Sequence, residues 1–167
     1  MSQRGTEWRS AFVGIGSNLD RPARQVELAM AALDEITDTC VTARSHLYRS
    51  SPLGGIEQPD FVNAAASLLT LLEPQELLEQ MQAIERARGR ERTDQRWGPR
   101  VIDLDLLVFA DLVIDEPDLT LPHPGIGERN FVLLPLRELA PDLDIPGLGC
   151  VSAIPVNEQE PRIARIA

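Results

Sequence analysis

Two acidic residues one position apart, Asp103 and Asp105, are the side chains best placed to do chemistry in this chain. The segment Val101–Phe109 is predicted to be a strand because it is rich in branched and apolar residues. Strand side chains alternate between faces, so the two carboxylates share one face. The other face would carry the apolar side chains Ile102, Leu104, Leu106 and Val108. Paired carboxylates suit Mg2+, which binds one or two carboxylates plus substrate phosphates, and the alternative is a solvated strand face with two ordinary acids.

A cluster of arginines precedes this strand. All 16 basic residues are Arg, and six of them lie within residues 86–100 of a chain whose formal net charge is −10. Guanidinium groups bind phosphate through paired hydrogen bonds, so arginines that lead into a carboxylate pair indicate a nucleotide polyphosphate site. A solvated helix face is the alternative for Arg86 and Arg88. Nonspecific nucleic-acid binding is disfavoured, since the rest of the acidic surface would repel a polyanion.

Composition and length narrow the class of protein. The lack of lysine excludes P-loop NTPases, protein kinases and Schiff-base enzymes. A length of 167 residues predicts one globular domain over residues 1–167, with 1–9 and about 148–167 peripheral. No apolar stretch suits a signal peptide or a membrane span. Cys40 and Cys150 lack metal-ligand spacing, which favours free thiols in the cytoplasm.

Six elements are expected before residue 110. They are a strand at 11–15, a helix after Pro22, strands at 39–49 and 61–72, a helix from Pro74 that Gly89 ends, and the strand at 101–109. This βαββαβ order predicts an α+β, ferredoxin-like fold with an antiparallel sheet and an elaborated C-terminal part, including a short helix near 131–139. Gly14 and Gly16 lack the third glycine of a dinucleotide fingerprint and are interpreted as a tight strand-to-helix turn.

Several segments together resemble the 6-hydroxymethyl-7,8-dihydropterin pyrophosphokinases of folate synthesis. They are GIGSNL (14–19), RSSPLGG (49–55), QPDFVNAA (58–65), RWGPRVIDLDLLVF (96–109), LPHPGIGERNFVLLPL (121–136) and ELAPDL (138–143). The resemblance runs from about residue 10 to 145. It implies a ferredoxin-like fold and transfer of a pyrophosphoryl group from MgATP to the pterin hydroxymethyl group, with release of AMP.

The resemblance also implies roles for individual residues on the nucleotide side. Asp103 and Asp105 would bind two Mg2+ ions, and Arg92 and Arg100 would act with them on the triphosphate. Further ATP contacts would come from Gln82, Glu85, Arg90, Thr120, His123 and Arg129. For His123 the alternative is a purely structural role.

On the pterin side, a flat heteroaromatic ring needs aromatic faces and fixed hydrogen bonds at its edge. The resemblance assigns the stacking to Phe61 and Phe131, for which core packing is the alternative. Asn63 would pair with the amide edge of the ring. The remaining contacts would come from Ser50, Leu53 and Trp97.

The sequence departs from the family pattern at a few positions and leaves rival functions open. Phe61 stands where Tyr is frequent, Pro124 where an aromatic residue occurs, and Asp118 where some members carry an arginine. The expected partners are ATP and the pterin, with no nucleic acid or membrane, and the expected state is a monomer. The rivals are a small-molecule sensor domain and a two-metal cyclase or polymerase-like palm, which analysis of the products would separate.

Overall fold

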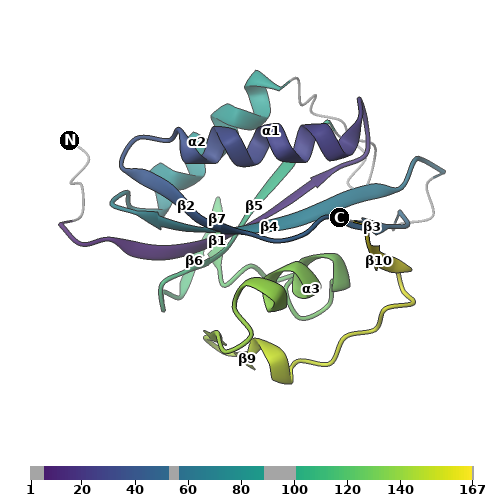
Figure 1. The fold of residues 1–167 in the computed structure, drawn as a ribbon. Helices are drawn as coiled ribbons and strands as arrows, with labels where there is room; N and C mark the ends of the chain where they lie inside the picture. Colours follow the sequence, from purple (N-terminus) through teal and green to yellow (C-terminus); the bar gives the residue numbers. More distant parts are fainter. Residues whose placement is uncertain (1–5, 53–56, 89–100, 167) are drawn as a thin grey trace.

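A computed structural model of the chain describes residues 6–52, 57–88 and 101–166, and a six-stranded antiparallel sheet lies at its centre (Figure 1). The strand order is β10-β3-β4-β1-β5, and β2 also pairs with β4. The strands are β1 (Arg9–Ser17), β2 (Thr39–Arg44), β3 (Tyr48–Ser50), β4 (Phe61–Thr70), β5 (Asp103–Phe109) and β10 (Ile163–Arg165). The predicted α+β, ferredoxin-like architecture is confirmed.

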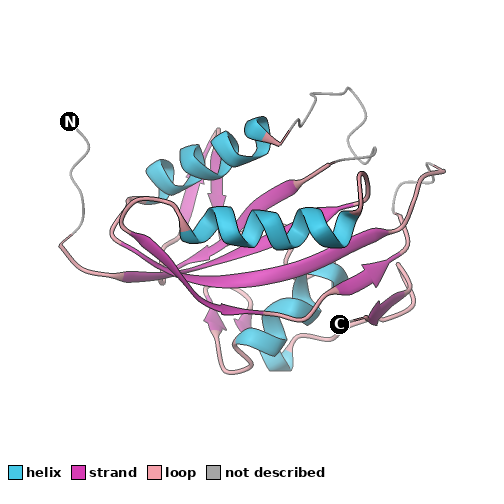
Figure 2. Ribbon diagram, turned by 45° about the horizontal axis from the view of Figure 1, so that its top comes forward, coloured by secondary structure: helices cyan, strands magenta, loops and turns pink. Residues whose placement is uncertain are grey.

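Helices cover both faces of this sheet (Figures 1 and 2). Helices α1 (Pro22–Asp34) and α2 (Pro74–Ala87) lie on one face, and α3 (Asn130–Leu139) lies on the other. Proline begins both α1 and α2, and a reciprocal capping box between Glu73 and Glu76 closes the start of α2. The smaller elements are the hairpin β6 (Ile114–Glu116) and β7 (Leu119–Leu121), the pair β8 (Asp144–Ile145) and β9 (Gly149–Cys150), and a 3-10 turn at Val151–Ala153.

Each face of the sheet buries its own hydrophobic cluster. The cluster under α1 and α2 includes Val13, Leu33 and Leu77, and the cluster under α3 includes Phe12, Leu107 and Leu133. The burial of these apolar side chains in two close-packed clusters stabilises the sheet and its helices. Within the described residues, no helix is both long enough and apolar enough to cross a membrane.

The predicted strand at 39–49 is wrong in one respect, because it is interrupted between β2 and β3. At Ser45 the side-chain Oγ accepts the amide hydrogen of Ala65 at 2.8 Å, where a regular ladder would use a backbone carbonyl. Residues 45–47 therefore form a kink, and β2 and β3 pair with different parts of the same strand β4. The local hydroxyl competes with the ladder, which periodicity alone does not reveal.

The prediction for the apolar face of β5 also needs a correction. The pairing register shifts so that Phe12 lies opposite Val108 while Val13 lies opposite Leu106. Leu107 is the extra residue of this bulge, and both Leu107 and Val108 pack on the α3 side. Val108 thus does not share a face with Leu104 and Leu106, although the two aspartates before the bulge keep the predicted common face.

Candidate active site

One row of paired residues crosses four strands and joins the two halves of the candidate site. Tyr48, Asn63, Gly16 and Asp103 are successive partners on β3, β4, β1 and β5. Directly opposed residues point to the same face, here the face towards α3. Two strand spacings separate Asn63 from Asp103, or about 10 Å. Because Gly16 has no side chain, the floor between them stays open.

The two glycines of β1 form this floor, and the prediction that they make a tight turn is wrong. Both lie inside the strand, and the turn comes later, where Asp20 and Arg21 adopt positive φ angles. A Cβ added to Gly16 would lie 3.4 Å from Asn63 Oδ1, and one added to Gly14 would lie 3.5 Å from the Leu107 side chain. At these distances a methyl group at either position would make ordinary van der Waals contact, so the glycines leave the sheet surface uncovered without preventing a clash.

The aspartate pair is held by a buried carboxylate from α2. Glu85 is 3% exposed, and its Oε2 accepts the Leu104 amide hydrogen at 3.0 Å. Leu104 lies between Asp103 and Asp105 on the outer strand, so this bond fixes the backbone from which both project. The sequence predicts Gln82 and Glu85 as nucleotide contacts; in the structure the Gln82 side chain is exposed on α2 and Glu85 lies against β5.

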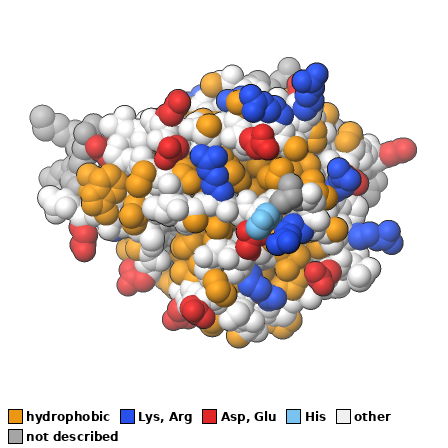
Figure 3. Space-filling model, viewed as in Figure 1, with side chains coloured by type: hydrophobic (Ala, Val, Ile, Leu, Met, Phe, Trp, Pro, Cys, Tyr) orange, Lys and Arg blue, Asp and Glu red, His pale blue; other side chains and the backbone are white. Residues whose placement is uncertain are grey.

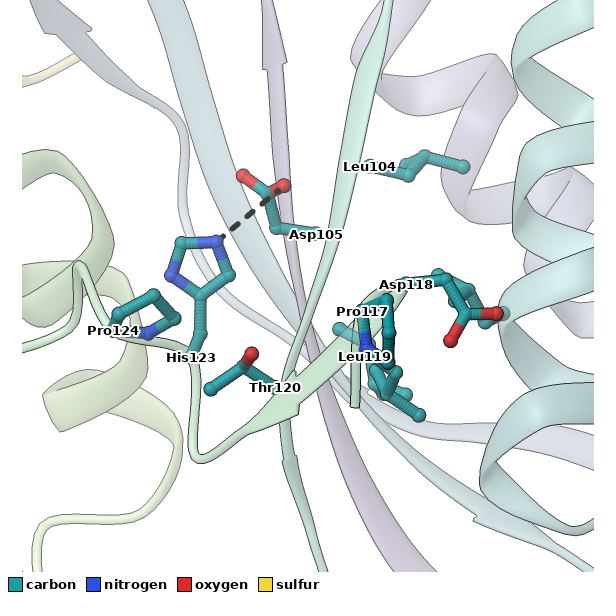
Figure 4. Close-up of a pocket in the computed structure, with 10 residues that line it drawn as sticks. Leu104, Asp105, Pro117, Asp118, Leu119, Thr120, His123 and Pro124 are labelled. Carbon is teal, nitrogen blue, oxygen red and sulfur yellow. Dashed lines mark ion pairs between the residues drawn. The ribbon is translucent and has the colours of Figure 1, made fainter. Parts of the chain in front are cut away.

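Asp105 borders a pocket of about 280 Å³ between β5 and the segment that follows β6 (Figure 4). Of the predicted ATP contacts, Thr120 and His123 line the same pocket. Its lining is Leu78, Leu104, Asp105, Leu106, Pro117, Asp118, Leu119, Thr120, His123 and Pro124. The pocket therefore gathers one predicted metal ligand, two predicted nucleotide contacts and two of the departures from the family pattern, Asp118 and Pro124.

The imidazole of His123 faces Asp105 across this pocket, with Nε2 3.8 Å from Oδ1 (Figure 4). The Gly125 amide donates to His123 Nδ1 at 3.0 Å, so the neutral ring carries its proton on Nε2. Burial lowers the pKa of His123 from its ordinary value, the nearby charge of Arg129 lowers it further, and Asp103 opposes them. At neutral pH the ring is thus an uncharged donor aimed into the pocket.

Arg129 reaches the same region over a glycine. A Cβ on Gly125 would lie 2.7 Å from Arg129 Nε and 2.8 Å from its Cζ, so the guanidinium lies against bare backbone. Arg129 was predicted to contact the nucleotide, whereas no role was predicted for Gly125. The signal for Gly125 was its place in the segment 121–136, two residues after His123.

The residues predicted for the pterin lie on the same sheet face, on the far side of Gly16. Asn63 Nδ2 donates to Ser50 Oγ at 2.7 Å, and both side chains are buried. Phe61 lies opposite Ser50 at the start of β4 and is half-buried. Phe131 is half-buried in α3 and packs against the α3-side cluster, so both aromatic side chains keep partly exposed surface.

Three further hydrogen bonds at the end of β1 were not predicted. Asn18 Nδ2 donates to Gln58 Oε1 at 2.9 Å and to the Pro59 carbonyl at 3.0 Å. Ser17 Oγ donates to the Val101 carbonyl. These bonds tie the end of β1 to the residues that lead into β4 and β5. Five predicted site residues lie outside the described residues, namely Leu53, Arg90, Arg92, Trp97 and Arg100.

The donor set fits Mg2+ in the manner of a substrate-bridged site. Across residues 6–52, 57–88 and 101–166, no group of three or more His, Cys, Asp or Glu side chains could hold a metal ion. Mg2+ is usually bound by one or two carboxylates, with water and substrate phosphates completing its octahedron. Asp103 and Asp105, both partly exposed on one face, match that requirement.

Charge is unevenly distributed over the surface. In the face shown in Figure 3, Arg side chains (blue) lie mostly over the right-hand half, where Figure 1 places β3 and β10, and acidic side chains (red) are spread over the whole face. On the right-hand half of this face (Figure 3), arginine side chains thus offset part of the acidic charge. Such an arrangement favours an anionic substrate that arrives with a divalent cation.

Comparison with known proteins decides the family. The model of the 7,8-dihydro-6-hydroxymethylpterin-pyrophosphokinase family matches residues 12–141. The chain belongs to this family. It is 48% identical over 135 residues to the 2-amino-4-hydroxy-6-hydroxymethyldihydropteridine pyrophosphokinase of Pseudomonas aeruginosa, covering 81% of this chain and 83% of the relative. It is 42% identical over 137 residues to the Haemophilus influenzae protein of the same name, covering 82% and 85%.

Solved structures agree on the fold of this pyrophosphokinase-family chain. The Plasmodium falciparum HPPK-DHPS protein with pteroate superposes with a TM-score of 0.73 at 15% sequence identity. The match covers 92% of this chain and 43% of that one, so the chain spans less than half of the longer Plasmodium protein. At 15% identity this similarity supports a shared fold and nothing beyond it.

Proposed function

We propose that the protein transfers pyrophosphate from MgATP to the hydroxymethyl group of 6-hydroxymethyl-7,8-dihydropterin, releasing AMP, in folate synthesis. Membership in the pyrophosphokinase family gives the reaction and its two substrates. The observation that carries the assignment to this site is the row that sets Asn63 and Asp103 on one sheet face with only Gly16 between them. A pterin at Asn63 and a triphosphate at Asp103 would meet over that glycine.

The pterin ring would lie between Phe61 and Phe131, with its amide edge on Asn63. The hydrogen bond from Asn63 Nδ2 to Ser50 Oγ supports this role, because it fixes the orientation of the side-chain amide. Oδ1 then turns towards Gly16, where it can accept a hydrogen bond from a ring N–H. Leu53 and Trp97 would complete the site.

The nucleotide would occupy the pocket at Thr120 and His123, with its phosphates towards Asp103 and Asp105. Asp103 and Asp105 would hold two Mg2+ ions, which would supply positive charge to stabilise the phosphates and the leaving AMP. His123 would donate its Nε2 proton to a phosphate oxygen without adding a buried charge. Arg129 would contribute a fixed positive charge, as would Arg90, Arg92 and Arg100, while Gln82 and Glu85 border the nucleotide from α2.

The chemical step is an in-line displacement at the β-phosphorus. The pterin hydroxyl oxygen forms a bond to that phosphorus, the bond to the AMP oxygen breaks, and the hydroxyl proton passes to solvent. The main task of the chain is to hold the two reactants in line, which can contribute several kcal/mol to the rate. Asn63 and Asp103 lie on opposite sides of Gly16, which supports a pterin site and a triphosphate site next to each other.

We further propose that residues 1–167 act as a single domain, as a monomer, and in the cytoplasm. The residues proposed for both substrates come from one chain, which supports a monomeric site. Cys40 and Cys150 are free thiols, which suits a reducing compartment.

The decisive experiment incubates the protein with MgATP and the hydroxymethyl dihydropterin and follows AMP and the pterin pyrophosphate. We expect the two products in equal amounts. Inorganic pyrophosphate in place of the pterin product, or no product, would contradict the proposal.

The same assay tests the metal assignment with Asp105→Asn, which removes one charge at nearly constant volume. We expect turnover to fall roughly 100-fold or more, since a neutral amide is a weaker Mg2+ ligand and a lost metal interaction costs several kcal/mol. The matched control is Asp111→Asn, the same change at an exposed position just after β5. Equal activity of both variants, with intact folding by circular dichroism, would show that Asp105 is no metal ligand.

A further inference from the structure

The C-terminal segment returns to the main sheet beside the proposed pterin site. It lies beyond the residues matched by the family model, which end at 141. Ile163 pairs with Ser50, and Arg165 pairs with Tyr48. Ile163 is 7% exposed, so the strand is packed as well as hydrogen-bonded.

Additional bonds continue this contact on both sides of β10. The Ser51 amide donates to the Arg162 carbonyl at 3.0 Å, and the Arg162 amide donates to Ser51 Oγ at 3.1 Å. At the other end, the Ile166 amide donates to the Leu47 carbonyl at 2.9 Å. Strand β3 has only three residues, so β10 supplies about half of the backbone pairing that holds it in place.

The same segment is clamped to α3 by one side chain. Asn130 Nδ2 donates to the Asn157 carbonyl at 2.6 Å and to the Pro161 carbonyl at 2.7 Å. Both hydrogens of the amide are thereby used, and Asn130 is only 5% exposed. Asn130 is the first residue of α3 and directly precedes Phe131.

The two attachments lie on opposite walls of the proposed pterin site. One wall is β3 and β4, where Ser50 orients Asn63 and Phe61 pairs with Ser50. The other wall is the start of α3 with Phe131. We infer that residues 157–166 form a strap that sets the separation of these walls, and that Asn130 is a positioning residue for pterin binding through it.

The inference rests on the proposed function, because it takes Phe61, Asn63 and Phe131 as the pterin contacts. A ring stacked between two aromatic side chains needs a fixed gap, and a shift of the order of 1 Å weakens such a site steeply. The nucleotide pocket is lined by residues of α2, β5 and the segment 117–124, whereas β10 pairs with β3 among the described strands. Arg129, the proposed nucleotide contact that precedes Asn130, packs against Gly125, which lies outside the strap. Loosening the strap should therefore affect pterin binding and spare nucleotide binding.

The test compares Asn130→Ala with Arg137→Ala. Arg137 also donates from α3 to a carbonyl of the C-terminal part, with Nη2 2.7 Å from the Ile154 oxygen, but it lies about two helical turns further along. Pterin affinity is measured by calorimetry with saturating Mg2+ and α,β-methylene-ATP, and KM for MgATP is measured separately. We expect Asn130→Ala to weaken pterin binding about tenfold with KM for MgATP within about twofold of the parent, and Arg137→Ala to match the parent in both.

Other outcomes overturn the inference. Parent-like pterin affinity in Asn130→Ala would show that the strap is merely structural, and equal weakening by Arg137→Ala would show a general loosening of α3. If Asn130→Ala does not fold, Ser51→Ala decides, since it removes only the Oγ acceptor of the Arg162 amide: weaker pterin binding supports the strap, and unchanged binding overturns it. A parent that binds the pterin but forms no AMP would refute the proposed function and leave the comparison of the variants valid.

Discussion

At the residue scale, the pocket combines the carboxylate of Asp105, which we propose as a metal ligand, with an imidazole that stays neutral. Asp105 and His123 face each other at 3.8 Å, which is too long for a hydrogen bond. The Gly125 amide fixes the ring tautomer, and burial keeps the ring unprotonated. A neutral His123 therefore adds no positive charge that would compete with the Mg2+ ion proposed at Asp105.

The lowered pKa of His123 predicts a pH dependence of stability. A group whose pKa is lower in the folded than in the unfolded state binds fewer protons when folded, so its contribution is full above the ordinary value of 6.5 and is lost as the pH falls below it. In His123→Asn, the amide oxygen can still accept the Gly125 hydrogen but does not titrate. We expect the parent to lose more melting temperature than this variant between about pH 7.5 and about pH 5. Parallel curves would show that His123 is not buried as described.

Because the Arg129 side chain packs against Gly125, a substitution of Gly125 should change nucleotide binding through Arg129. In Gly125→Ala the new Cβ would clash with Arg129 Nε at 2.7 Å and displace the guanidinium. A charge-assisted hydrogen bond contributes about 1.5–3 kcal/mol, so KM for MgATP should rise roughly 10-fold to 100-fold.

Gly127→Ala is the matched control for this change. Its Cβ would meet only Leu148 Cδ2 at an ordinary 3.6 Å, so KM should stay at the parent value. A double-mutant cycle with Arg129→Ala checks the mechanism, because Gly125→Ala should add nothing once the arginine is gone. Full additivity would mean that Gly125→Ala acts by another route.

At the scale of the elements, α2 fixes the strand that carries the aspartates. Among the described residues, strand β5 is at the edge of the sheet, so its outward amides have no neighbouring strand there to bind. The Glu85 carboxylate takes the Leu104 amide, and this bond also protects the edge from pairing with another chain. The helix thus helps to set the direction of both aspartates.

Replacement of Glu85 by leucine tests this link. A buried amide left without an acceptor costs about 1–3 kcal/mol, which corresponds to a fall in melting temperature of roughly 2–12 °C for a protein of this size. Turnover should fall as well, because the backbone between the aspartates loses its anchor. Glu85→Gln keeps an acceptor oxygen and should recover most of the stability. Glu79→Leu, at an exposed position of α2, is the control and should melt close to the parent.

The sequence could predict the helices and strands that are marked by apolar periodicity and by residues that begin or end helices. Proline begins α1 and α2, and apolar spacing identifies their buried faces. It could not predict the kink at Ser45 or the bulge at Leu107, because each depends on what a distant strand offers as a partner. Gly14 and Gly16 were misinterpreted for the same reason: the strands that pair with β1 and keep both glycines inside it lie far away in sequence.

At the scale of the whole molecule, the sheet brings residues from four separate segments onto one face. Alternation along a strand predicts that Asn63 shares a face with Phe61, and Asp103 with Asp105. It does not predict that Asn63 lies opposite Gly16 and Gly16 opposite Asp103, since that requires the register of three strands. The C-terminal strand β10 is the clearest omission, because three residues carry too weak a pattern to be placed next to β3.

The shared floor predicts that the two substrates bind with positive coupling. Asn63 and Asp103 are separated by about 10 Å, or two strand spacings, so a bound nucleotide would form one side of the space that the pterin enters. Contact between the ligands, and ordering that the first ligand has already completed, both favour the second. We expect Mg2+ and α,β-methylene-ATP, in which the bond to be broken is replaced, to tighten pterin binding at least about tenfold, within the usual range of coupling. Calorimetry in both orders is the sharp measurement, because the pterin must tighten nucleotide binding by the same factor. Equal pterin affinity with and without the analogue would mean that the two substrates do not meet over Gly16.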